Sequence, residues 1–263
     1  MNDQPGWWTH RRGPGPVVAT AIHDGHFVGP AALAEMELAD ADRLREEDPF
    51  TGEALLDLPT YTIACRSRFE VDLNRAREVA IYRTPEQSWG LRVWRDEPSE
   101  AVCREGIAYH AAYYAHIAAL LDDVARLHPR FVLLDVHSYN HRRDGPDAPP
   151  TPQIDAPDIN IGTFSMPREE WAFLLDPLIE AMREYEFCGR KLDVRENVAF
   201  QGKGEQTRFV HERYPGRGCA IALEFKKIYM DEWSGEPDPQ AVRAMRGLLS
   251  EAAEAATRLL SRA

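Results

Sequence analysis

Three apolar runs of this chain each carry a side chain that can bind a metal ion or transfer a proton. His23 and His26 follow the run PVVATAI, His137 ends the run FVLLDVH, and Glu224 lies inside the run AIALEF. Imidazole is a common zinc ligand, and a carboxylate beside an activated water can act as a general base. This combination favours a hydrolytic metal enzyme over a binding module.

The segment HDGH, residues 23–26, comes directly after a predicted strand. Open α/β folds bind their ligands at the carboxyl ends of the strands, and Gly25 permits a tight turn there. His23 and His26 are therefore candidate metal ligands. The alternative is a surface loop with two incidental histidines, because the spacing of the pair is a weak signal by itself.

Two further strands carry the residues that make a metal site plausible. Asp135 precedes His137 by two residues, so both side chains lie on the same side of an extended strand, and the carboxylate can orient the ring. Glu224 interrupts a buried run, and a buried carboxylate is costly unless it is paired or near a cation. Glu224 is therefore either a general base or a structural partner of Lys226 or Arg208.

The segment RSRFEVDLNR supplies Arg66, Arg68, Asn74 and Arg75. Arginine and asparagine together can hold a carboxylate or a carbonyl oxygen, and Arg68 can also stabilise an oxyanion. Taken as isolated charges, these residues would instead form a solvated face.

The arrangement of predicted strands and helices indicates the fold. Strands are predicted at 16–22, 130–138, 158–164 and 219–231 and at the start of 61–75; helices are predicted at 30–49, 99–128, 167–186 and 238–262; and loops at 142–157 and 200–209. This alternation predicts an α/β three-layer sandwich with a mixed, mostly parallel central sheet. We expect a flexible N-terminal segment at 1–16 and a single catalytic domain at 17–263.

The composition narrows the possible partners. The 263 residues are 44% hydrophobic, enough for a sizeable core, and carry a net charge of -12, which disfavours nucleic acid as a partner. No apolar run reaches the roughly 18 residues of a membrane span. The N-terminus lacks an apolar signal-peptide core, and the four cysteines are scattered, so we expect a cytoplasmic protein with reduced thiols.

The order of five short motifs resembles the N-formylglutamate amidohydrolase family. These motifs are HDGH, SRFEVDLNR, LLDVHS, DINIGTF and ALEFKKIYMDE, within roughly residues 17–235. The family's relatives are the zinc carboxypeptidases and the aspartoacylase group. The resemblance implies a carboxypeptidase-like fold and one zinc ion, with His23 as the first ligand and His137 as the last. The wider superfamily has a glutamate as second ligand, three residues after the first; His26 stands there in this chain, so the second ligand is either His26 or a carboxylate such as Asp24.

The same resemblance implies roles for the remaining candidates. Glu224 matches the carboxylate that activates water, Arg68 matches an oxyanion-stabilising arginine, and Asn74 and Arg75 match a pair that grips the substrate carboxylate, with Arg208 as an additional candidate. The implied reaction is zinc-dependent hydrolysis of an N-acylated amino acid, a small-molecule substrate with a free carboxylate. A metallocarboxypeptidase and a metal-free binding relative are the alternatives, and the oligomeric state stays open.

Overall fold

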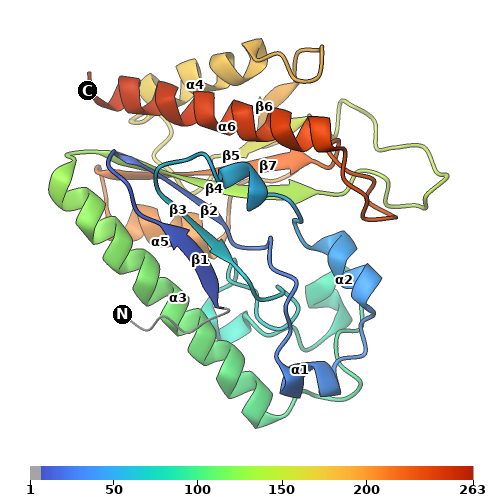
Figure 1. Cartoon of the computed structure of the whole chain (residues 1–263). Helices are drawn as coiled ribbons and strands as arrows, with labels where there is room; N and C mark the ends of the chain where they lie inside the picture. Colours follow the sequence, from blue (N-terminus) through green and yellow to red (C-terminus); the bar gives the residue numbers. More distant parts are fainter. Residues whose placement is uncertain (1–6, 263) are drawn as a thin grey trace.

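The chain folds around one seven-stranded sheet in the structure, a computed structural model that describes residues 7–262 (Figure 1). In sheet order the strands are β1 (Trp8–Arg11), β3 (Tyr61–Ala64), β2 (Val17–Ala21), β4 (Phe131–Tyr139), β7 (Gly218–Lys226), β5 (Ile159–Gly162) and β6 (Val194–Glu196). The four strands β3, β2, β4 and β7 run parallel, whereas β1 and β5 pair antiparallel with β3 and β7. The predicted mixed, mostly parallel sheet is confirmed.

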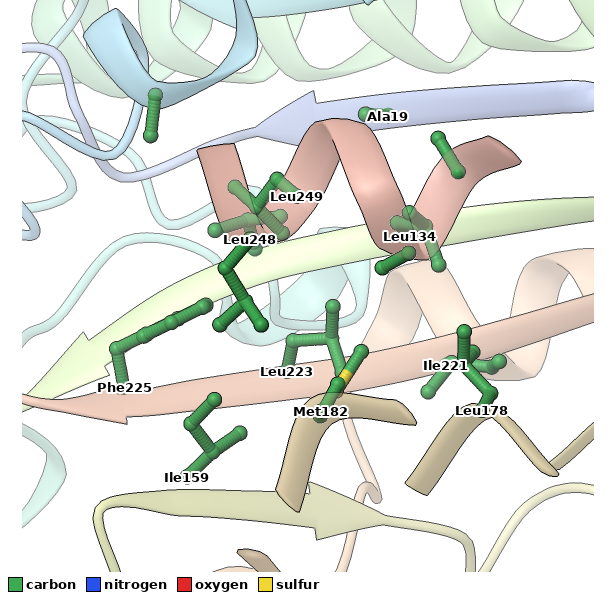
Figure 2. Close-up of a cluster of buried hydrophobic side chains, with 14 of the residues drawn as sticks. Ala19, Leu134, Ile159, Leu178, Met182, Ile221, Leu223, Phe225, Leu248 and Leu249 are labelled. Atoms are coloured by element: carbon green, nitrogen blue, oxygen red, sulfur yellow. The ribbon is translucent and has the colours of Figure 1, made fainter. Parts of the chain in front are cut away.

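Helices cover both faces of this sheet. The helices α4 (Ala172–Glu184) and α6 (Pro239–Leu260) lie on one face, and α3 (Glu100–Leu127) and α5 (Glu205–Arg213) lie on the other (Figure 1). Figure 2 shows Leu178 and Met182 of α4 and Leu248 and Leu249 of α6 packed over strand residues such as Leu134. The predicted three-layer α/β sandwich is therefore confirmed.

Two central strands are buried along their whole length, which is typical of strands covered on both faces. Every residue of β2 and β4 is buried. In β4, Val132 and Leu134 face the α4/α6 layer, so Asp135 and His137 project toward the opposite layer. The functional side chains of this strand therefore emerge on the α3/α5 side of the sheet.

Two predicted segments differ from the structure near the N-terminus. The helix expected at 30–49 is divided into α1 (Pro30–Glu35) and α2 (Asp40–Glu46), because Met36 leaves the helix and pairs with Trp94. Part of the segment 1–16, which we expected to be flexible, is instead the edge strand β1, held by pairing with β3. Residues 1–6 lie outside the described residues.

The loop expected at 200–209 contains the start of a helix. Helix α5 begins directly after Gly204, where an added Cβ would lie 2.1 Å from the Asn74 side-chain oxygen. Gly204, one of the glycines that suggested a loop, permits this close approach, and the helix follows it. Within residues 7–262, no helix is long and apolar enough to cross a membrane.

Candidate active site

The predicted residues from three strands converge on one pocket at the carboxyl edge of the sheet. His23 follows the end of β2, and His137 and Glu224 are register partners on the neighbouring parallel strands β4 and β7. Register partners in parallel strands point to the same face, so these two side chains are neighbours. All three residues line a pocket of about 400 Å³.

His23, Asp48 and His137 form a compact group at the bottom of this pocket. The Nδ1 atoms of the two histidines are 3.1 Å apart, and Asp48 Oδ2 lies 3.2 Å from His137 Nδ1 and 3.4 Å from His23 Nδ1. All three side chains are nearly inaccessible to solvent. The group offers two imidazole nitrogens and one carboxylate oxygen to a single point.

The carboxylates behind the two rings determine which nitrogens face this point. Asp72 Oδ1 lies 2.7 Å from His23 Nε2, and Asp135 Oδ1 lies 3.1 Å from His137 Nε2. A carboxylate favours the tautomer in which the ring nitrogen that it faces carries the proton and donates a hydrogen bond, which leaves the Nδ1 lone pair of a neutral ring directed toward the group. Two lone pairs and a carboxylate that converge in this way repel one another unless a cation lies between them.

The spacing of the three atoms suits a zinc ion. Zinc bonds of 2.0–2.2 Å in tetrahedral geometry place ligand atoms roughly 3.3–3.6 Å apart. The observed separations of 3.1–3.4 Å agree with this value to within a few tenths of an ångström. The residues present therefore fit a zinc ion held by three protein ligands, the number that is typical of catalytic rather than structural zinc sites.

Asp48 is the member of the group that the sequence did not reveal. It follows α2, and its backbone N–H donates to the carbonyl of His23 over 2.9 Å. Lys227 Nζ donates to the carbonyls of Glu47 and Arg45, which precede Asp48 in the chain, at 2.8 and 2.5 Å. In the sequence, Asp48 and Pro49 suggest only the end of a helix, and no local signal brings them to His23.

The two outer carboxylates are held in place by hydrogen bonds from distant segments. Asp135 Oδ1 accepts a bond of 2.6 Å from Gln206 of α5, and Gln206 in turn accepts a bond of 2.6 Å from the Tyr113 hydroxyl of α3. Asp72 accepts hydrogen bonds from the Tyr82 hydroxyl and from Arg68. These hydrogen bonds hold the two carboxylates that face the histidine rings.

The electrostatics of the pocket favour positive charge at the group of three. Burial would lower the pKa of His137, but the charges of Asp135 and Glu224 and hydrogen bonds donated to the carboxylates of Asp135 and Asp48 raise it well above its usual range. Burial likewise opposes ionisation of Asp48, yet hydrogen bonds with both histidines hold its pKa well below its usual range. A cation at this point is stabilised whether it is a proton or a metal ion.

Glu224 has the opposite environment. Burial raises its pKa to about 7, and the nearby charge of Asp48 adds to this, although His137 opposes it. The structural partners considered for it are engaged elsewhere, because Lys226 pairs with Asp158 and Arg208 pairs with Glu205. A carboxylate with a pKa near neutrality in a pocket has the properties of a general acid or base.

His26 and Asp24 do not lie in the group of three. The His26 ring contacts Glu47 and is 3.1 Å from Asp40, with about a third of its side chain exposed. Asp24 Oδ1 accepts a hydrogen bond of 2.8 Å from the Gly52 backbone. The position occupied by His26 in the motif therefore lies outside the group, and the carboxylate that joins the two histidines is Asp48.

The predicted substrate-binding residues are only partly brought together. Arg68, Asn74 and Arg75 line the pocket, with the side chain of Arg75 half exposed. Arg208 is not among the pocket-lining residues and forms an exposed ion pair with Glu205. Arg66 points away, to Glu70 and Glu105.

Two other motifs hold the loops around the pocket. Asn160 of the DINIGTF segment accepts hydrogen bonds from the backbone of Val198 and Ala199, and its amide donates to the Phe200 carbonyl. Glu232 of the YMDE segment accepts the backbone N–H groups of His141 and Arg142 at 2.7 and 3.0 Å. Their role is to position pocket walls rather than to contact the group of three.

The fold and the pocket together define an α/β enzyme with a group of side chains that can hold one metal ion at the carboxyl edge of its sheet. The family model for N-formylglutamate amidohydrolase matches residues 15–230, and the chain belongs to this family. The family consists of hydrolases that act on amide bonds.

The solved structures that resemble this chain agree with the fold. An N-formylglutamate amidohydrolase from Ralstonia eutropha JMP134 superimposes with a TM-score of 0.74 at 17% identity, covering 98% of both chains. A gene product of Agrobacterium tumefaciens superimposes with a TM-score of 0.65 at 15% identity, covering 96% of both chains. Among curated proteins, none matches the sequence.

Proposed function

We propose that this chain is a zinc-dependent amidohydrolase that cleaves an N-acylated amino acid of the N-formylglutamate type into a carboxylate and a free amino acid. The observation that carries the proposal is the convergence of His23, Asp48 and His137 beside Glu224 in one pocket. Membership of the amidohydrolase family supports the choice of an amide bond as the target.

His23, Asp48 and His137 are the residues that would hold the metal, and the oxygen of Asp48 takes the place proposed for the second ligand. A zinc ion bound there would supply Lewis-acid chemistry, by lowering the pKa of a coordinated water toward about 7 and polarising a carbonyl. Asp72 and Asp135 then act behind the ligands, because they fix the orientation of the rings.

Glu224 is proposed to be the general base. Its pKa of about 7 allows it to accept a proton from water at neutral pH and to donate that proton to the leaving amine afterwards. It lies opposite His137 in the strand register, so the proton is taken beside the metal-binding group.

Arg68 is proposed to stabilise the oxyanion of the tetrahedral intermediate. Its guanidinium is mostly buried and lines the pocket, with one contact of 3.2 Å to Asp72 and a long contact of 3.4 Å to the Glu46 carbonyl. Within residues 7–262, its Nε has no hydrogen-bond partner. A buried guanidinium with a free donor is suited to charge that develops during the reaction.

Asn74 and Arg75 are proposed to bind the free carboxylate of the substrate. Both line the pocket, and the Asn74 side-chain NH₂ group and the Arg75 guanidinium are donors from which a carboxylate can accept hydrogen bonds. Arg75 Nε lies 3.7 Å from Asp72, so its guanidinium is oriented but remains available for a bidentate contact. The structure gives Arg208 no comparable position, so we leave it out of the proposed binding site.

The test combines metal analysis with a substrate panel. Purified protein should contain close to one zinc ion per chain, lose activity after chelation and regain it with added zinc. N-formyl, N-acetyl and N-succinyl amino acids are assayed beside short peptides. Hydrolysis of peptides alone would favour a metallocarboxypeptidase, and a protein that neither binds metal nor hydrolyses any of these compounds would favour a binding relative.

A further inference from the structure

Trp89 adopts a backbone conformation that a bulky residue rarely takes. It ends the short 3₁₀ helix η3 (Pro85–Ser88) with φ 56° and ψ 29°, in the left-handed region. That position at a helix end usually carries glycine or asparagine, because a side chain there crowds the following carbonyl. The next residue, Gly90, is also left-handed and stands in open space. The strained left-handed position is therefore occupied by a tryptophan, although a glycine stands at the next position.

The surrounding turn holds Trp89 in this conformation. Thr84 and Gln87 form a reciprocal capping box at the start of η3, and Ser88 Oγ donates to the Leu91 carbonyl at 2.8 Å. The Gly90 backbone N–H donates to the Pro85 carbonyl at 2.7 Å. A residue that is held in a strained backbone conformation by the hydrogen bonds of its neighbours is often part of a functional site.

The ring of Trp89 is placed against the pocket rather than in the core. It lines the pocket and is 44% exposed, although it packs edge-on against Phe69 and Tyr82. The guanidinium of Arg68 lies over the ring, 4.6 Å from its centroid. Tyr82 also donates to Asp72, so the ring belongs to the same assembly that orients His23.

We propose that Trp89 is a positioning residue for Arg68 and an apolar wall of the substrate pocket, and that the strained backbone is retained because it presents the ring there. This inference rests on the proposed function, in which Arg68 faces the reacting carbonyl. The ring restricts the guanidinium to one plane, since Asp72 and the Glu46 carbonyl contact only its terminal nitrogens. The exposed part of the Trp89 ring is available to contact the substrate next to its reacting carbonyl.

Three substitutions separate this role from a structural one. Trp89→Phe keeps an aromatic face under Arg68 and should retain kcat and KM within about threefold. Trp89→Ala and Trp89→Gly remove the face, and kcat/KM for an N-formyl amino acid should fall roughly 5- to 30-fold in both, the range between an exposed and a desolvated cation–π contact. Because only glycine relieves the left-handed strain, Trp89→Gly should melt roughly 2–4 °C above Trp89→Ala.

Fluorescence gives a readout that does not depend on turnover. Addition of L-glutamate, a product of the proposed reaction, to the zinc-loaded protein should change the tryptophan emission of the wild type and not of Trp89→Phe. Unchanged kcat and KM in Trp89→Ala, or an emission change that persists in Trp89→Phe, would overturn the inference. If the wild type hydrolyses no N-acyl amino acid, the proposed function fails instead, so the two failures are distinguishable.

Discussion

Replacement of Asp48 by asparagine tests whether the second metal ligand is this carboxylate, which follows α2. Asparagine keeps the shape of the side chain, and the backbone bond from Asp48 to the His23 carbonyl is unaffected. The substitution removes the negative charge that faces two imidazole nitrogens at 3.2 and 3.4 Å. We expect the affinity for zinc to fall by at least about 100-fold, because changes even behind the ligands cost 10- to 100-fold.

The size of the effect can be read from melting curves. At a zinc concentration of about 100 times the wild-type Kd, binding stabilises the folded state by about 2.7 kcal/mol, whereas a 100-fold weaker variant gains only about 0.4 kcal/mol. For a chain of this length these values correspond to shifts of roughly 5–11 °C and 1–2 °C. Competition with a chromophoric chelator measures the two Kd values directly.

The control variants replace two residues that are near the group of three in the sequence but do not belong to it. Asp24→Asn and His26→Gln alter the two alternatives that the motif offered, and both should keep the full zinc-dependent shift. A wild-type shift in Asp48→Asn, or loss of the shift in His26→Gln, would refute the assignment of the ligands.

Four further predictions concern residues in and around the pocket. Glu224→Gln should lower kcat by about 10²–10⁴-fold with zinc content unchanged, and an unaltered rate would remove the base from the mechanism. Because Glu224 must be deprotonated to act, kcat/KM of the wild type should fall about tenfold per pH unit below its pKa, which is about 7 before metal binds and lower afterwards. Hydrogen bonds from His141 and Arg142 outweigh burial and lower the pKa of Glu232 to about 2, so its stabilisation is present above pH ~4.5 and lost as the pH falls toward ~2. Glu232→Gln should therefore lower the melting temperature at pH 7 and have less effect near pH 3. Arg208→Ala should leave KM unchanged, and a large rise would return this residue to the binding site.

The strand ends were predictable because they depend on local patterns. Continuous apolar runs mark buried strands, and parallel neighbours bring their carboxyl ends to one edge, so His23, His137 and Glu224 could be assigned to one pocket. The position of Asp135 relative to His137 follows from the two-residue period of a strand. The division of 30–49 into two helices was not predictable, because Met36 pairs with a residue far along the chain.

The sequence by itself determined the layered α/β architecture, the family and the strand-borne members of the candidate site, since these follow from hydrophobic periodicity and from motifs that are continuous in the chain. Only the tertiary structure decided which carboxylate completes the group of three. Asp48 meets His137 across 89 positions of sequence, and His26 turns instead to Glu47. Tertiary packing likewise placed Trp89 against Arg68 and left Arg208 outside the pocket. Metal ligands are side chains that come together in space. The spacing of residues along the chain cannot predict which side chains meet when they belong to segments that come together only after folding.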